Sequence, residues 1–99
     1  MSDVRLIRHY ALFYEYVTEN LIELRAPHRP LHLALIAEWT ADGRVLHGGA
    51  LGDPPHGALI VFAVDDPAEV EAFAGQDPYV AAGIVTSWRV EPWNVVARN

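Results

Sequence analysis

The chain has 99 residues, of which 52% are hydrophobic and none is cysteine, and its formal net charge is −6 at pH 7. This length gives one domain, residues 1–99, with a single modest core, and the apolar content excludes a disordered chain. The acidic balance argues against nucleic acid or a membrane surface as a partner, and the lack of cysteine excludes disulfides, thiolate metal sites and cysteine nucleophiles.

The first predicted element is a strand over residues 9–17, which read His-Tyr-Ala-Leu-Phe-Tyr-Glu-Tyr-Val. Apolar and aromatic residues fill nearly every position, and this is typical of an inner strand that is covered on both faces. The residues before Arg8 are expected to form a loose lead-in.

A helical region with a kink is predicted next, over residues 19–42. Thr18 or Asn20 can cap its first short turn, and Pro27 interrupts the apolar stripe that begins there. We therefore expect a short turn of helix, a kink near His28, and then the main helix.

The main helix places a titratable ring on its apolar face. Pro30 suits a first turn, and Gly43 supplies the left-handed residue that commonly follows a last turn. The spacing i, i+3, i+4, i+7 puts four residues on one face: His32, Leu35, Ile36 and Trp39. From this spacing alone, a core histidine that is satisfied by hydrogen bonds is the more common interpretation of His32.

A hairpin of two strands follows the main helix. Residues 44–51 regain strand character, but the pair Gly48 and Gly49 weakens it and indicates a bulge or a close approach to the backbone. Residues 52–57 are dense in turn formers and close the hairpin, and residues 58–64 form a second buried strand.

The second long helix is predicted to start at Pro67, capped by Asp65 or Asp66, and to end at Gly75. Its inner face consists of Val70, Phe73 and Ala74. This helix supplies the other half of the apolar layer that covers the sheet.

The end of the chain holds one more helical turn and the last strand. Asp77 and Pro78 begin a helix of one turn at most, which Gly83 ends. The last strand or strand pair lies within residues 84–97, with Pro92 confined to an edge or a bulge.

The succession of strand, helix, two-stranded hairpin, helix and strand is the ferredoxin-like βαββαβ arrangement. It is an α+β fold in which an antiparallel sheet carries helices on one face only. The other face carries large apolar residues that need a partner surface, so we expect a homodimer formed through this open face.

The chain resembles the YCII-related (YciI-like) family of dimeric α+β-barrel proteins. The matching stretches, in chain order, are Tyr10-Ala-Leu-Phe-Tyr, Arg29-Pro-Leu-His32-Leu-Ala, Gly43-Arg44-Val-Leu-His-Gly48-Gly49, Asp77-Pro78-Tyr79-Val-Ala-Ala-Gly83-Ile and Val90-Glu-Pro-Trp93-Asn94. The Asp-Pro-Tyr-x-x-x-Gly match is the most specific of them. The resemblance implies the ferredoxin-like fold, dimerisation through the open sheet face, and an acid/base pair that falls on His32 and Asp77.

An imidazole acts as a general base near neutral pH when a carboxylate fixes its tautomer. With the resemblance included, we favour His32 as the base and Asp77 as its orienting partner, although Asp77 is also an ordinary helix cap before Pro78. Arg29 is a candidate contact for an anionic group of the substrate or, equally, a solvated charge at a helix end.

Four further residues are candidate substrate contacts. Tyr79 and Tyr14 are candidates for lining the cleft, although aromatic residues of a small domain belong to the core more often. Gly48 and Gly49 offer backbone that a ligand can approach closely.

A metal site is the weaker alternative. His28 and His32 stand at i and i+4, with Asp77 as a third ligand, but the glutamate of the helical zinc-protease motif is missing and Pro30 disturbs the turn between the rings. We therefore expect no metal and no cofactor. His47 and His56 are expected on a strand surface and in a loop.

These features predict an enzyme that catalyses proton transfer on a small cyclic or aromatic compound, of isomerase or lyase type. The alternatives are a domain that binds a small-molecule ligand without turnover, and a purely structural dimerising domain. No apolar run approaches the length of a signal peptide or a membrane span, so we expect a cytoplasmic protein.

Overall fold

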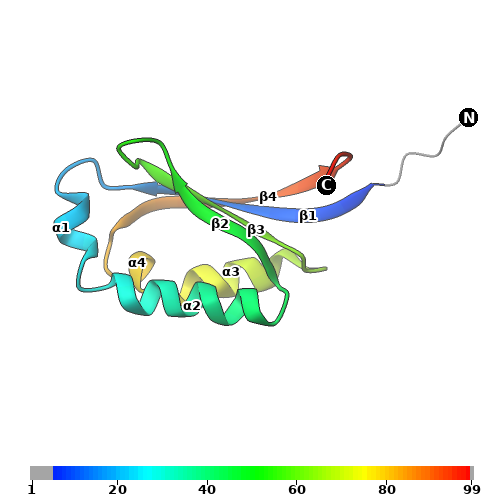
Figure 1. Cartoon of the computed structure of the whole chain (residues 1–99), viewed down its shortest axis with the longest axis horizontal. Helices are drawn as coiled ribbons and strands as arrows, with labels where there is room; N and C mark the ends of the chain where they lie inside the picture. The colour runs from blue at the N-terminus through cyan, green and yellow to red at the C-terminus, as the bar shows by residue number, and fades with distance from the viewer. Residues whose placement is uncertain (1–5, 99) are drawn as a thin grey trace, which may run out of the picture.

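The computed structural model describes residues 6–98, and a four-stranded antiparallel sheet in the order β2-β3-β1-β4 lies at its centre (Figure 1). The strands are β1 (Ile7–Tyr16), β2 (Val45–Leu51), β3 (Gly57–Phe62) and β4 (Val85–Val95). The helices are α1 (Leu21–Arg25), α2 (Arg29–Ala41), α3 (Pro67–Gln76) and α4 (Pro78–Ala81). The predicted ferredoxin-like α+β fold is confirmed.

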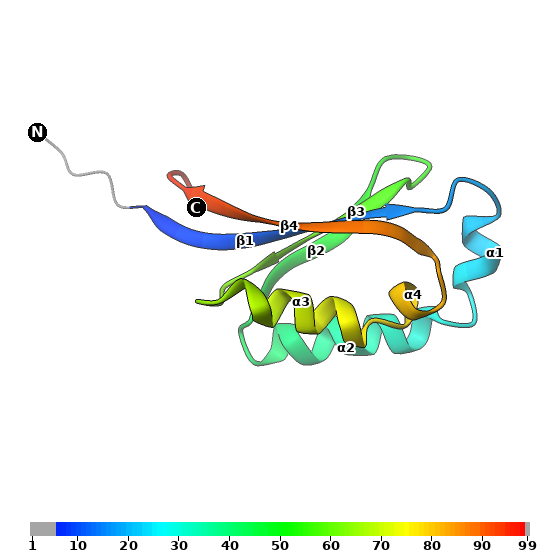
Figure 2. The ribbon, with the colours of Figure 1, turned by 180° about the vertical axis from the view of Figure 1, so that it is seen from behind.

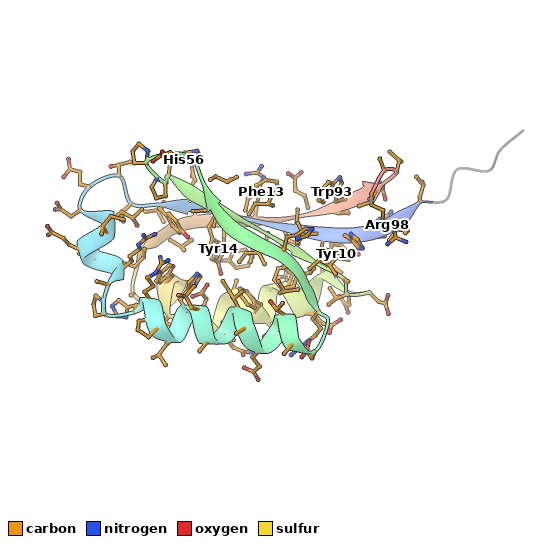
Figure 3. The ribbon with its side chains drawn as sticks, viewed as in Figure 1. Tyr10, Phe13, Tyr14, His56, Trp93 and Arg98 are labelled. Carbon is orange, nitrogen blue, oxygen red and sulfur yellow. The ribbon has the colours of Figure 1, made fainter. Side chains whose placement is uncertain are left out.

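The helices cover one face of the sheet only. α2, α3 and α4 lie beneath the sheet, α1 lies at one end of it, and no helix of the described chain covers the upper face (Figures 1 and 2). Tyr10 and Tyr14 of β1 point toward the helices, whereas Phe13 and Trp93 point to the opposite side (Figure 3). This alternation follows from the two-residue period of a strand.

The core lies between the sheet and the helices. Its most deeply buried apolar side chains are Leu12, Ile60, Phe62, Val70, Phe73 and Tyr79. At the end of α2, the Trp39 ring meets Phe62 edge-on at a centroid distance of 5.9 Å and Phe73 at 5.2 Å. The Arg44 guanidinium lies 3.6 Å from the centroid of the Trp39 ring and covers it. Edge-to-face contacts of this kind add to the burial energy of large rings.

Most helix ends lie where the sequence predicts them. Pro30 stands in the first turn of α2, and Gly43 has a φ of +88° just beyond its end. The Asp66 side chain accepts a hydrogen bond from the Ala68 backbone N–H at 2.8 Å, which caps α3. Asn20 takes the capping position of α1 with a φ of 57°, although its side chain makes no capping bond.

Two predicted boundaries at the ends of elements are wrong. Ile7, which was predicted to lie in the lead-in, belongs with Arg8 to β1, because both pair with the last residues of β4. Leu6 precedes the strand, and residues 1–5 of the predicted lead-in lie outside the described residues. Gly75 lies inside α3, which runs on to Gln76. The helix ends there because Asp77 precedes a proline and takes an extended ψ of 120°.

The irregularity of β2 also lies elsewhere than at the predicted glycine pair. Gly48 and Gly49 pair regularly with Ile60 and Leu59, and the register shift falls between Val45 and His47. The last strand is one element, β4, and its Pro92 stands at the sheet edge opposite Tyr10. An edge position tolerates the missing N–H.

Candidate functional site

Asp77 stands at the junction of α3 and α4, and it is 0% exposed. One carboxylate oxygen, Oδ1, accepts the capping hydrogen bond from the Tyr79 backbone N–H at 3.0 Å. The other, Oδ2, accepts a hydrogen bond from the Tyr14 hydroxyl at 2.8 Å. Nδ1 of His32 lies 2.8 Å from Oδ1 and 3.0 Å from Oδ2. His32 and Asp77, the pair that the family resemblance implies, thus lie within hydrogen-bond distance, and the buried carboxylate has three donors.

These contacts determine the tautomer of His32. A carboxylate only accepts hydrogen bonds, so Nδ1 carries the proton and Nε2 of the neutral ring keeps its lone pair. Within residues 6–98, both contacts of the ring with Asp77 run through Nδ1. The ring is 6% exposed and stacks on Tyr79 at a centroid distance of 3.8 Å and an angle of 7°. His32 is thus buried and hydrogen-bonded, with one ring nitrogen left over for a ligand.

A cavity of about 350 Å³ adjoins the His32 ring. Ile36 and Ile60 give it apolar walls, and the backbone of Gly48 and Gly49 forms part of another side. A volume near the lower end of the range for small-molecule sites suits a ligand of one ring.

The structure brings most of the predicted site residues together. Those that line the cavity are Arg29, His32, Gly48, Gly49 and Tyr79. Asp77 contacts the His32 ring but is not part of the cavity wall. Tyr14 is not part of the wall either, because its hydroxyl is bound to Asp77.

The Tyr14 hydroxyl is a permanent donor to this carboxylate. Burial raises the pKa of Tyr14 far above its ordinary value, and the charge of Asp77 raises it further. The hydroxyl therefore stays protonated at neutral pH and holds Oδ2 of Asp77.

Two polar side chains of the cavity wall were not predicted from the sequence, those of Arg25 and Tyr16. Arg25 ends α1 and lines the cavity together with Arg29, and their spacing of four residues was the available signal. Tyr16 follows Tyr14 by two residues and so shares its face of β1, which was the signal for this residue.

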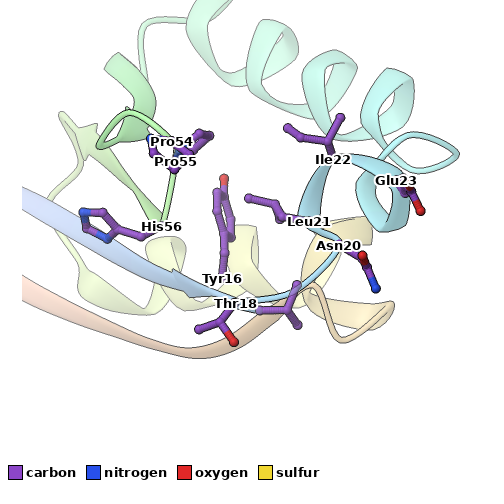
Figure 4. Close-up of a pocket in the computed structure, with 10 residues that line it drawn as sticks. Tyr16, Thr18, Asn20, Leu21, Ile22, Glu23, Pro54, Pro55 and His56 are labelled. Atoms are coloured by element: carbon purple, nitrogen blue, oxygen red, sulfur yellow. The ribbon is translucent and has the colours of Figure 1, made fainter.

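Tyr16 separates the His32 cavity from a second cavity of about 440 Å³. The Tyr16 ring lies between Pro55 of the β2–β3 loop and Leu21 of α1 (Figure 4). The loop is tied to β1 by a hydrogen bond of 3.0 Å from the Tyr16 N–H to the His56 carbonyl. The loop and α1 therefore determine the shape of both cavities.

The alternative interpretation was a metal site with His28, His32 and Asp77 as ligands. No group of three His, Cys, Asp or Glu side chains gathers in the described residues as a metal site would require. His47 is exposed on β2, and His56 lies at the end of the hairpin loop. Within residues 6–98, no helix has the length and apolar character that crossing a bilayer requires.

Comparison with known proteins adds a family and a fold. The sequence profile of the YCII-related domain matches residues 9–94. A similar solved structure is 5-chloro-2-hydroxyhydroquinone dehydrochlorinase from Burkholderia phenoliruptrix AC1100 in complex with 2,5-dihydroxybenzoquinone, with 22% identity, a TM-score of 0.72 and coverage of 86% of this chain and 92% of that one. Another is a dimeric ferredoxin-like protein from an uncultured marine organism, with 16% identity, a TM-score of 0.54 and coverage of 96% and 92%. Among curated proteins there is no match.

Proposed function

This chain belongs to the YCII-related domain family, and from that premise we propose that it is a small-molecule enzyme in which His32 is the general base and Asp77 orients it. The reaction is a proton transfer on a small ring compound, of lyase or isomerase type, and it needs no cofactor. The observation that carries the proposal is the Nδ1 contact with Asp77 at 2.8 Å, because it leaves Nε2 as the basic atom beside a cavity.

In the forward step, Nε2 takes a proton from a carbon or oxygen atom of the substrate. The electron pair of the broken bond forms a new π bond in the substrate. In a lyase, the bond to the leaving group breaks as the π bond forms, and its electron pair departs with the leaving anion. In an isomerase, an existing π bond shifts instead, and the imidazolium returns the proton to a different atom of the substrate. The Asp77 carboxylate stabilises the imidazolium through the Nδ1–H hydrogen bond.

The remaining contacts position this pair. The Tyr14 hydroxyl and the Tyr79 backbone N–H hold Asp77, and the Tyr79 ring supports the face of the imidazole. Arg29 and the backbone of Gly48 and Gly49 are the proposed substrate contacts. Dehydrochlorination, the reaction for which the similar Burkholderia protein is named, removes a proton and a chloride from a ring compound, and this supports the lyase class here.

The test is turnover of a panel of chlorinated and unsubstituted hydroquinones, followed by chloride release and by deuterium exchange from solvent. We expect His32→Gln to lower kcat by about 10²–10⁴-fold, because a general base contributes on that scale. Its melting temperature should change little, since the glutamine amide can still donate to Asp77. His47→Gln, an exposed position on β2, is the matched control.

Asp77→Asn tests the orienting role separately. An amide donates where only an acceptor is wanted, so the productive tautomer becomes less populated and kcat falls. Ligand binding by a parent protein that turns nothing over would instead favour the binding-domain alternative. A large drop in the melting temperature of His32→Gln, with ligand affinity per folded molecule unchanged, would make His32 a structural residue.

The open sheet face supports the second part of the proposal, a homodimer. Phe13 and Trp93 lie on this face (Figure 3), and Trp93 is 48% exposed. Trp93 borders two hollows of about 250 and 550 Å³, one shared with Phe13 and the other with Leu46. A second copy would cover these apolar side chains, and the similar marine protein is described as dimeric.

We expect the dimer to bury more than about 1,000 Å², the scale of a stable interface. Sedimentation equilibrium at micromolar concentration should give twice the chain mass, and Trp93→Glu should give a monomer. A parent protein that sediments as a monomer would contradict this part of the proposal.

A further inference from the structure

The His32 cavity is bordered by two arginines, Arg25 and Arg29, that pair with no carboxylate among residues 6–98. Arg25 is half-buried at the end of α1, and Arg29 is exposed at the start of α2. The arginine–carboxylate pairs within residues 6–98 are Arg44 with Asp42 and Arg89 with Glu91. None of the residues that line the cavity is acidic. A chain with a net charge of −6 therefore has a cavity with only positively charged or neutral walls.

The charges of both arginines reach the hydroxyl of Tyr16 in the cavity wall. Burial raises the pKa of Tyr16 to about 12, with smaller contributions from Tyr79 and Asp77, and Arg25 and Arg29 oppose this rise. The Tyr16 hydroxyl is therefore a protonated donor at neutral pH. Tyr16, Arg25 and Arg29 line the same cavity, so an anion in it has both charges and this donor at its wall.

Tyr79 provides a second, independent observation. Its hydroxyl is buried and makes no hydrogen bond with any residue of the described chain, although its ring lines the cavity. An unpaired buried hydroxyl is costly, and it gains free energy when a ligand supplies a polar partner.

We propose that the cavity selects a small aromatic carboxylate, which Arg25 and Arg29 bind through its carboxylate group. The two guanidinium groups supply planar forks of N–H donors that match a carboxylate, and Tyr16 donates to the same group. The ring of the ligand lies against Ile36 and Ile60, with a polar substituent at Tyr79. This inference rests on the proposed function, because it names the substrate class of the same site.

The size of the cavity favours a carboxylate over a phosphorylated ligand. About 350 Å³ accommodates one ring and a planar anionic group. Phosphate sites usually add backbone N–H groups at a helix N-terminus, and the start of α2 carries Pro30, which has no N–H.

The test compares benzoate with benzamide, its neutral isostere, by isothermal titration calorimetry. We expect the parent protein to bind benzoate at least about tenfold more tightly than benzamide, a difference of about 1.4 kcal/mol. Arg25→Gln and Arg29→Gln should each remove most of this preference and leave the affinity for benzamide unchanged. The preference should also weaken as salt is added, because ions screen the charges.

Arg44→Gln is the matched control, because it removes the same charge beyond the opposite end of α2. Equal affinity of the parent for benzoate and benzamide, absence of benzoate binding, or an unchanged preference in Arg25→Gln would overturn the inference. Displacement of benzoate by inorganic phosphate at an equal or lower concentration would also overturn it, in favour of a phosphorylated ligand.

Different measurements test the preference for a carboxylate and the enzymatic function. His32→Gln should keep the preference for benzoate while it loses turnover, because the arginines act on binding alone. If the parent protein prefers benzoate but turns over no substrate, the role of the two arginines is supported and the proposed enzymatic function is contradicted. Turnover of neutral ring compounds without any preference for benzoate would do the reverse.

Discussion

The two ends of α2 each hold a ring against the rest of the domain, but the surroundings of the two rings differ. His32, near the start, stacks face to face on Tyr79 at 3.8 Å and adjoins a cavity. Trp39, seven residues later on the same side of the helix, meets Phe62 and Phe73 edge-on. The exposed fractions of the two rings are nearly equal, at 6% and 4%, so burial alone does not distinguish a site from a core.

The difference lies in the partners of each ring. The rings of Phe62 and Phe73 pack against Trp39, and the Arg44 guanidinium covers it. His32 has one nitrogen held by a buried carboxylate and the other without a protein partner in the described chain. A helix face with one apolar pattern therefore packs into the core at one end and presents the proposed base, His32, at the other.

Trp39→Ala should give the largest loss of stability, and it should affect the packing at the end of α2 without affecting the His32 cavity. Removing a buried ring of this size costs about 3–5 kcal/mol of unfolding free energy, because a cavity remains among Phe62 and Phe73. We expect this loss in urea denaturation, with the affinity for benzoate per folded molecule unchanged. A loss below about 1 kcal/mol would mean that the apolar end is not the stabilising one.

Tyr14→Phe should have the next largest effect, at the polar end. It removes a hydrogen bond to a buried carboxylate, which contributes about 1.5–3 kcal/mol. We also expect kcat to fall more than KM changes, because Asp77 then holds His32 less firmly. Tyr10→Phe, on the same face of β1, is the control and should change stability by less than about 0.5 kcal/mol. Equal effects of the two variants would contradict the positioning role.

Tyr79→Phe should leave stability unchanged or raise it by about 1 kcal/mol, since the hydroxyl that is removed has no partner in the described chain. A ligand that carries a polar group for this hydroxyl, such as a hydroxylated benzoate, should bind more weakly to the variant. A clear loss of stability would show that the hydroxyl is satisfied within the protein.

Tyr16→Phe should have the smallest effect at pH 7 and a visible one only in alkali. The pKa of Tyr16 rises from 10.0 to about 12 on folding, so the folded state holds this proton more tightly than the unfolded state. The stabilisation is complete below about pH 10 and is lost as the pH rises toward 12. Melting temperatures between pH 8 and 11.5 should therefore fall less steeply in the variant, and an identical slope would contradict the assignment.

The sequence predicts the fold well because proline, glycine and aspartate residues mark where its helices begin and end. Pro30 and Gly43 mark the two ends of α2, Pro67 begins α3, and the Asp77–Pro78 pair begins α4. Each residue acts through restraints on its own backbone, which the rest of the chain does not change. Gly75 shows the limit of this reasoning. A glycine weakens a helix without ending it, and the proline that follows decided where α3 stops.

The site could be predicted only in part. His32 and Asp77 lie 45 residues apart, so their contact came from the family resemblance, and the spacing identified the histidine alone. The Tyr14 contact with Asp77 spans 63 residues, and no local pattern distinguishes it from an ordinary core tyrosine. Arg25 was missed because its four-residue spacing from Arg29 crosses the turn between α1 and α2, so the spacing does not by itself place the two side chains together.

Asp77 ends α3, begins α4 and contacts the imidazole of His32. The first two roles serve the fold, and only the third serves the proposed reaction. If a descendant of this protein lost its substrate, selection on folding alone would still retain the aspartate, since its oxygens hold the Tyr79 backbone and the Tyr14 hydroxyl. The imidazole also donates to this carboxylate, but a glutamine amide can do the same, so folding alone does not require histidine at position 32. Across diverging lineages, we therefore expect histidine at position 32 to mark proteins that keep the proposed activity, and aspartate at position 77 to mark those that keep the fold.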